Sequence, residues 1–308
     1  MVNSRTILLG FILFASISLV HSSDEEREWK TANGVPLLKA SPFVAQLHIV
    51  RRDSNEPITC SGSLISNRHI LTAAHCFFSA MMCIPNQKMT QQNILDNTIV
   101  DKNNSRVILG SLCGVSSLNQ SNECFDSDER IIARIANIYV NADFPHEQCA
   151  SADIAVIELV NPVPYDRFTP IRIADYRTVR RNVLPVVDIA GWGFNPRYPG
   201  KMPSPRIERV TVWTQSCWGI PRNYKDDVIC LDQRWQSGCR GDSGSGLIVR
   251  KNNADYLLGV YVAGEECKGM QRGRGDNSRK PGIAIDMRKH SRFIRDINEH
   301  KLSQVYVI

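Results

Sequence analysis

The chain has 308 residues, of which 43% are hydrophobic and 22% charged, an ordinary globular composition with room for one large domain or two small ones. Its net charge of +6 is too small to indicate a nucleic-acid partner. The ten cysteines are consistent with five disulfide bridges, but their number does not fix the pairs.

The first 22 residues have the pattern of a secretory signal peptide. Arg5 precedes the apolar run Ile7–Val20, which is 14 residues long and too short to span a bilayer comfortably. Val20-His21-Ser22 supplies small or modest residues at a cleavage site. A membrane anchor is the alternative, which the length disfavours. We therefore expect a secreted, extracellular protein, and secretion also accounts for the cysteines.

From Ser41 onward, short apolar or alternating runs separated by Gly, Pro, Asn and Asp predict an all-β fold. The predicted strands are Phe43–Val50, Ile99, Val107–Leu109, Ile135–Val140, Ile154–Val160, Val186–Ala190, Ile207–Trp213, Leu247–Val249 and Tyr256–Val262. Lys251–Ala254 is typical of a hairpin turn. Helical spacing appears only over Met287–Ile297, where Phe293, Ile294 and Ile297 share a face with His290.

The stretch Cys239–Leu247 places a serine between glycines, directly after an acid. Glycines permit a turn that exposes Ser243 Oγ and points the N–H groups of Gly241 and Ser243 at one position, where they would bind a developing oxyanion. A serine needs an adjacent base, and His75 in Leu71–Cys76 is the candidate. Asp153 is the candidate for orienting that base. A packed histidine, a strand cap and a turn serine are the structural alternatives.

These three local sequences, in the order His, Asp, Ser, resemble the chymotrypsin/trypsin family of secreted serine endopeptidases. The resemblance runs from about Asn33 to near Ile297 and implies one peptidase domain over residues 31–308. It implies two six-stranded antiparallel Greek-key β-barrels, an active site between them and a C-terminal helix. The implied reaction is acyl transfer, with Ser243 as nucleophile, His75 as proton carrier and Asp153 as its support.

The same resemblance implies protein or peptide substrates, an activating protease and protein inhibitors as partners. We expect neither nucleic acid nor membrane as a partner, and no cofactor. No metal is expected either, because no Cys/His group has the spacing of zinc ligands.

Residues 23–30 form a short acidic segment, which the resemblance identifies as an activation peptide cut after Lys30. The freed α-ammonium of Thr31 would then pair with Asp242 and shape the oxyanion turn. Thr31-Ala32 buries less than the family's usual β-branched aliphatic pair, by about 0.8 kcal/mol for each lost CH₂. Cleavage after Arg27, or a solvated leader without a switching role, are the alternatives.

Three disulfide bridges are implied by the resemblance: Cys60–Cys76, Cys217–Cys230 and Cys239–Cys267. The other four cysteines allow three pairings, of which we favour Cys113–Cys124 together with Cys83–Cys149. Val187 and Val249 stand where the family has another bridge, so two apolar side chains are expected to pack there.

The resemblance implies that Ser237, six residues before the nucleophile, lies at the base of the specificity pocket. Because no acid stands there, and Gly264 and Gly282 would leave the walls open, we expect an open uncharged slot. The predicted preference is chymotrypsin-like, for large apolar residues. Glu265 and Glu266 at the rim are the basis of the alternative, a preference for basic residues.

Several positions depart from the family. Ser245-Gly246 replaces a Gly-Pro pair, Val262 a serine that supports the aspartate, and Ala263 an aromatic that walls the cleft. The Val262 and Ala263 changes, together with the unusual Thr31-Ala32 start, favour a weakly active or inactive homologue that acts as a binding or regulatory module. The intact set of His75, Asp153 and Ser243 and the oxyanion glycine favour the active endopeptidase instead.

Two features of the chain are expected on the surface. Residues 77–105 have no family counterpart and predict a long loop beside His75. Asn103 and Asn119 stand in glycosylation sequons within predicted loops.

Overall fold

The computed structural model describes residues 34–54, 57–79, 90–115, 130–146, 149, 151–180, 185–196, 202–218, 220, 226–264, 267, 280–301 and 305–308. The predicted signal and activation peptides lie outside the described residues, together with Lys30 and Thr31. So do Cys83, Cys124, Asn119, Glu265 and Glu266.

The first barrel is a closed ring of six antiparallel strands. They are β2 (Val44–Ile49), β3 (Ile58–Leu64), β4 (His69–Thr72), β5 (Arg106–Leu109), β6 (Ile131–Asn141) and β7 (Ala155–Leu159). Pairing runs β5-β2-β3-β4-β7, and β6 closes the ring because it pairs with both β5 and β7. Strand β15 (Val305–Val307) extends this sheet by pairing with β6.

The second barrel is built in the same way. Its strands are β9 (Val186–Gly191), β10 (Glu208–Gln215), β11 (Val228–Leu231), β12 (Gly246–Lys251), β13 (Ala254–Ala263) and β14 (Gly282–Asp286). Strand β9 closes the ring by pairing with β10 and β12. Buried Val210 and Val212 alternate with exposed side chains along β10, as a strand with one face on a core requires.

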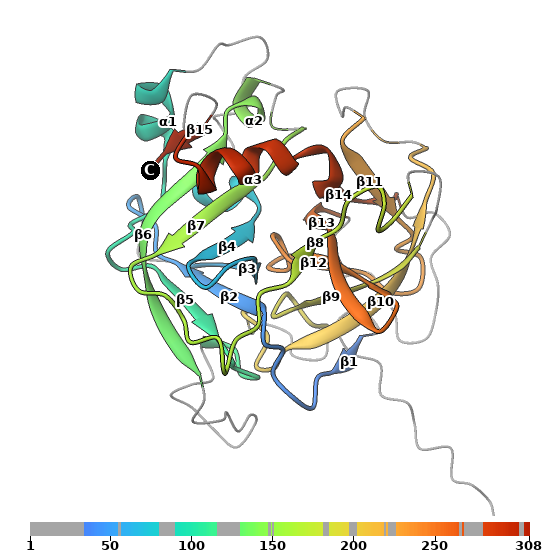
Figure 1. Cartoon of the computed structure of the whole chain (residues 1–308). Helices are drawn as coiled ribbons and strands as arrows, with labels where there is room; N and C mark the ends of the chain where they lie inside the picture. The colour runs from blue at the N-terminus through green and yellow to red at the C-terminus, as the bar shows by residue number, and fades with distance from the viewer. Residues whose placement is uncertain are drawn as a thin grey trace, which may run out of the picture.

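Short elements are attached to the second ring. Strand β1 (Val35–Pro36) pairs with β10, and β8 (Arg172–Ile173) runs parallel to β13. The two barrels lie side by side in Figure 1, which confirms the predicted all-β architecture of two six-stranded barrels.

The predicted C-terminal helix is present, with a different start. Residues Met287–Lys289 form a 3₁₀ turn, η5, and the α-helix α3 covers Ser291–Asn298. Phe293 and Ile297 are buried in the core cluster that contains the first barrel, so the predicted apolar face packs inward. Figure 1 shows α3 between β14 and β15, along the top of the molecule.

The expected surface loop over residues 77–105 is partly wrong. Its described part contains the helix α1 (Gln91–Asn97), which Thr90 caps by accepting the Asn93 N–H. Ile94 of this helix is fully buried, and isolated bridges join Phe78 to Thr98 and Arg51 to Val100. The described part of this segment therefore packs a helix against the first barrel.

Two smaller predictions agree with the structure. Asn252 and Asn253 both have positive φ (50° and 58°) in the tight turn that joins β12 to β13. Val187 and Val249 are both buried in the core cluster of the second barrel, where the family's further bridge would lie.

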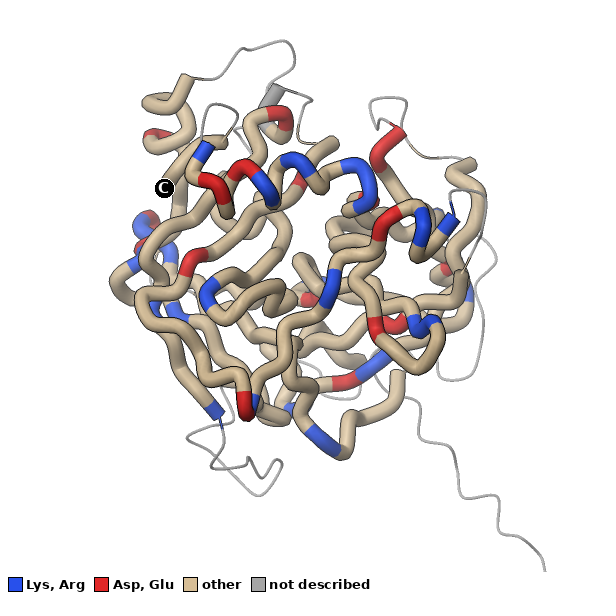
Figure 2. Tube along the Cα trace, in the orientation of Figure 1, with Lys and Arg blue, Asp and Glu red and all other residues tan. Residues whose placement is uncertain are grey.

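Charged residues of both signs are interspersed along the chain trace in Figure 2. In the described part of the chain, no helix combines the length and apolar character needed to cross a membrane.

Candidate active site

Strand pairing in the first barrel brings His75 and Asp153 together. Strands β4 and β7 are antiparallel, with Thr72 opposite Ala155. His75 lies in the 3₁₀ turn η1 (Ala74–Phe77) just after β4, and Asp153 lies just before β7. The Cys60–Cys76 bridge fixes η1 to β3. Residues 78 positions apart in the chain therefore meet at one end of the barrel.

The Asp153 carboxylate holds His75 by two contacts. The His75 backbone N–H donates to Asp153 Oδ1 (2.9 Å), and imidazole Nδ1 lies 2.7 Å from Oδ2. Burial lowers the pKa of His75, but the charge and hydrogen bond of Asp153 outweigh it, so the pKa is raised. With its Nδ1–H donated to the carboxylate, the imidazole presents Nε2 as the basic atom.

The loop that carries Asp153 is held by the second barrel. Ala152 has a positive φ (51°), and its N–H donates to Asp227 Oδ2 (2.9 Å). His290 Nε2 lies 2.9 Å from the same oxygen. Burial raises the pKa of Asp227, but hydrogen bonds from His290, Ala152 and Ser151 outweigh it and lower the pKa. Asp227 and His290 thus position Asp153, a role that no sequence motif indicated.

The turn around Ser243 has the backbone that its glycines predict. Gly241 and Gly244 have φ values of +97° and +86°, which only glycine adopts readily. No acceptor among the described residues takes the N–H of Gly241 or of Ser243. Both groups are therefore available to bind an oxyanion.

Backbone hydrogen bonds tie this turn to both barrels. The Ser61 N–H of β3 donates to the Ser243 carbonyl oxygen (2.7 Å), and the Gly244 N–H donates to the Tyr261 carbonyl oxygen of β13 (2.8 Å). A Cβ added at Gly244 would lie 2.2 Å from the Ser61 carbonyl oxygen, so only glycine allows this close approach. The nucleophile candidate is anchored where the two barrels meet.

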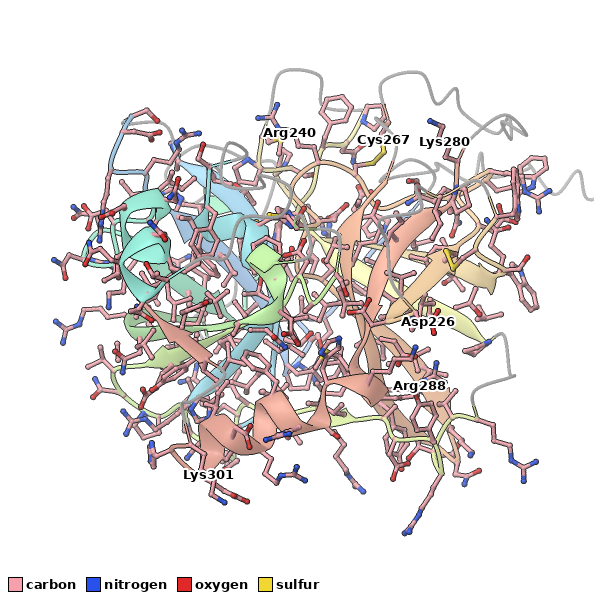
Figure 3. All side chains as sticks on the ribbon, turned by 90° about the horizontal axis from the view of Figure 1, so that it is seen from above. Asp226, Arg240, Cys267, Lys280, Arg288 and Lys301 are labelled. Carbon is pink, nitrogen blue, oxygen red and sulfur yellow. A yellow bond between two sulfur atoms is a disulfide. The ribbon has the colours of Figure 1, made fainter. Side chains whose placement is uncertain are left out.

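His75 and Ser243 line one cavity of about 440 Å³. Thr59 of the first barrel and Gly241 and Arg240 of the second line it as well. The exposed Arg240 lies along the same edge of the molecule as Cys267 and Lys280 in Figure 3. The cavity therefore joins the predicted base, nucleophile and oxyanion donors in a cleft between the barrels.

Asp242 is buried directly beside the nucleophile, with 1% exposure. Its two carboxylate oxygens accept the N–H groups of Gly193 and Cys239, each at 2.8 Å. Burial raises its pKa to about 6, although these hydrogen bonds oppose the change. Among the residues that the structure describes, no cation is paired with Asp242.

The region of the predicted specificity pocket differs from the open slot that the sequence predicts. A Cβ added at Gly264 would lie 2.2 Å from Tyr261 Oη, and one at Gly282 would lie 2.4 Å from Gln233 Nε2. The side chains of Tyr261 and Gln233 therefore fill the space between these glycines, and the expectation of an open slot is wrong. The glycines lack side chains of their own, but neighbouring side chains take their place. Ser237 lies fully buried near the base and donates to the Gly238 carbonyl oxygen (2.7 Å).

Two departures near the predicted triad have consequences that the structure describes. Both hydrogen bonds to the Asp153 carboxylate within the described chain come from His75, and Val262 is buried and contributes none. Ser245 Oγ donates to the Ala190 carbonyl oxygen of β9 (3.0 Å), which gives its extra side chain a buried partner.

The structure contains the bridges Cys60–Cys76, Cys217–Cys230 and Cys239–Cys267. Cys113 and Cys149 are also disulfide-bonded, and the partners predicted for them, Cys124 and Cys83, lie outside the described residues. Within the described chain, no group of three His, Cys, Asp or Glu side chains is arranged to hold a metal ion.

Comparisons with known proteins agree with this geometry. The family model described as Trypsin matches residues 38–288, most of the chain. The chain is 25% identical over 290 residues to the trypsin-like protease try-5 of Caenorhabditis elegans, covering 82% of each protein. It is 26% identical to the venom serine protease Bi-VSP of Bombus ignitus, covering 77% of this chain and 62% of that protein.

A third relative is mannan-binding lectin serine protease 1 of Rattus norvegicus. It is 24% identical over 76% of this chain, which spans only 32% of that longer protein. The family match and the relatives lead to one conclusion. The chain belongs to the trypsin family of serine endopeptidases.

Proposed function

We propose that the protein is a secreted endopeptidase that cleaves peptide bonds through a Ser243–His75–Asp153 triad. The observation that carries this proposal is the His75–Asp153 hydrogen bond in the cleft that Ser243 also lines. Ser243 Oγ attacks the peptide carbonyl while His75 Nε2 takes its proton, and the Gly241 and Ser243 N–H groups bind the oxyanion. His75 then protonates the leaving amine, and water releases the acyl group by the same route.

We further propose that the chain is made as a zymogen and activated by cleavage after Lys30. Asp242 supports this, because a buried carboxylate that pairs with no cation of the described chain is a ready partner for the new α-ammonium of Thr31. The ion pair would fix the turn that carries the oxyanion donors. The relative from Bombus ignitus is named as a venom serine protease, which supports secretion. Asn103 is exposed in a turn and remains a predicted glycosylation site.

The second candidate is a weakly active homologue that serves as a binding module. The filled specificity pocket favours it, since a substrate with a large side chain has no space to enter.

A fluorophosphonate probe tests the first proposal against the second. The probe forms an Oγ–phosphorus bond with an activated serine and releases fluoride. We expect labelling of the wild type after cleavage at Lys30, and none in Ser243→Ala or His75→Ala. Absence of labelling in a correctly cut, folded wild type would support the binding module instead.

A further inference from the structure

We propose that Tyr261 and Gln233 set the substrate specificity, by closing the pocket so that only Gly, Ala or Ser fits on the acyl side of the cut bond. This inference rests on the proposed function, because it concerns the residue whose carbonyl Ser243 would attack. It replaces the preference for large apolar residues expected from Ser237 and the two wall glycines.

Backbone hydrogen bonds place Tyr261 next to the nucleophile. Its carbonyl oxygen accepts the Gly244 N–H, and its N–H donates to the Ser245 carbonyl oxygen, both at 2.8 Å. Strand β13 thus runs alongside the nucleophile turn and leads directly to Gly264, three residues on. A substrate side chain beside Ser243 would have to pass between this segment and Gly238, which lies in the irregular segment that leads into the turn.

The tyrosine side chain spans that passage. Tyr261 Oη donates to the Gly238 carbonyl oxygen (2.9 Å) on one wall. On the other wall, the same hydroxyl oxygen lies 2.2 Å from the position of a Cβ on Gly264. A Cβ on Gly238 would lie 2.8 Å from the ring itself. Because Gly264 is exposed while Tyr261 is only 2% exposed, the obstruction lies close below the surface.

Gln233 holds the Tyr261 side chain in this position. Its Nε2 donates to Tyr261 Oη (2.8 Å), so the hydroxyl is both a donor and an acceptor. The Gln233 side chain fills the deeper space at Gly282 and is itself only 2% exposed. Moving the ring aside would break two buried hydrogen bonds, which makes closure the stable arrangement.

The chemistry of the closing groups also limits charged substrates. A phenol and a carboxamide carry no charge, and the base residue Ser237 is neutral and fully buried. An Arg, Lys, Asp or Glu side chain would lose water here and find no ion-pair partner among the pocket residues that the structure describes. A methyl or hydroxymethyl group needs no space beyond the obstruction, which leaves Gly, Ala and Ser as the residues that fit.

Peptides that differ only in this residue test the inference on the activated enzyme. We expect kcat/KM to be at least about 100-fold higher for Ala than for Phe or Arg, because the closed pocket excludes the larger side chains. In an open pocket, burial of the Phe side chain would instead favour Phe by roughly 10- to 150-fold. Tyr261→Ala should raise the Phe-to-Ala ratio at least tenfold. Tyr256→Ala, a matched tyrosine of β13 that stacks with Arg172 outside the cleft, should leave the ratio unchanged.

Gln233→Ala keeps the tyrosine ring and supplies a second variant in case Tyr261→Ala does not fold. It should raise the Phe-to-Ala ratio by less than Tyr261→Ala does. A wild type that prefers Phe or Arg would overturn the inference without any variant.

Indole binding separates this inference from the proposed function, because it requires no catalysis. In the Ser243→Ala background, calorimetry should detect indole binding after Tyr261→Ala and none with Tyr261 in place. Fluorophosphonate labelling of the wild type reports on the nucleophile alone. If the wild type is labelled but the Ser243→Ala protein binds indole with Tyr261 in place, the closed pocket is refuted and the peptidase proposal stands. If the wild type is not labelled but indole binds only after Tyr261→Ala, the peptidase proposal is refuted and the closed pocket stands.

Discussion

Ionisation of the buried Asp242 should make the uncut chain less stable as the pH rises. The folded state raises the pKa of this carboxyl from 3.8 to about 6 because burial penalises the charge. Between these two values the folded chain binds the proton more tightly than the unfolded chain does. The resulting stabilisation is complete below pH 3.8 and is lost as the pH rises through 6. Its size is about 3 kcal/mol, from 1.36 kcal/mol for each pKa unit.

The assay is urea unfolding followed by tryptophan fluorescence, on uncut chain kept intact by Lys30→Ala and Ser243→Ala. Other groups also titrate, so the informative quantity is the difference between this protein and its Asp242→Asn variant at each pH. We expect the free energy of unfolding of the Asp242 form, relative to the variant, to fall by about 2.4 kcal/mol from pH 4 to pH 8, because part of the unfolded carboxyl is already ionised at pH 4. Asp188→Asn, the same change at a half-exposed carboxylate of β9, is the control.

Cleavage after Lys30 should reverse the effect, because the new α-ammonium stabilises the ionised carboxylate. In the cut enzyme Asp242→Asn should then destabilise the protein near pH 7 and abolish probe labelling. A free-energy difference that does not change with pH in the uncut chain would contradict this prediction, since it would mean that the carboxylate already has a counter-charge or free access to water.

Three further changes test the site. Asp153→Asn should lower kcat by about 10⁴-fold, the loss found for the same change in a Ser-His-Asp triad. It should also shift the acid limb of the kcat/KM profile to lower pH, because it removes the charge that raises the pKa of His75. An acid limb at unchanged pH would contradict this. Asp227→Ala leaves the Ala152 N–H unpaired and should cost about 1.5–3 kcal/mol in urea unfolding at pH 7. Since the pKa of Asp227 is lowered, that cost should shrink as the pH falls below 3.8, and a constant cost would argue against the charge. Gly244→Ala should abolish probe labelling, whereas normal labelling would mean that the turn tolerates a Cβ.

The sequence predicted the chemical groups of the site better than their surroundings. His75, Asp153 and Ser243 each stand in a local motif, and the pairing of β4 with β7 brings the first two together as such motifs require. The alternation of apolar residues located most strands in the same way. Four barrel strands, β3, β4, β11 and β14, were not predicted. Strand β3 was missed because Ile58–Leu64 consists largely of small and polar residues that are nevertheless buried.

Contacts between distant residues explain most of the remaining errors. Asp227 and His290 are 63 positions apart, and nothing in either local sequence indicates that they hold the loop of Asp153. Tyr261 and Gln233 are 28 positions apart. Glycines in the pocket walls indicate where side chains are missing, but they carry no information about which other side chains enter the space.

The hydrogen bond from the Ser61 N–H to the Ser243 carbonyl oxygen makes this amide a probe of the contact between the two barrels. A separation of the barrels that moved the nucleophile away from its base would also expose this amide to solvent. Its rate of hydrogen exchange therefore measures how often the catalytic groups come apart, without substrate, inhibitor or label.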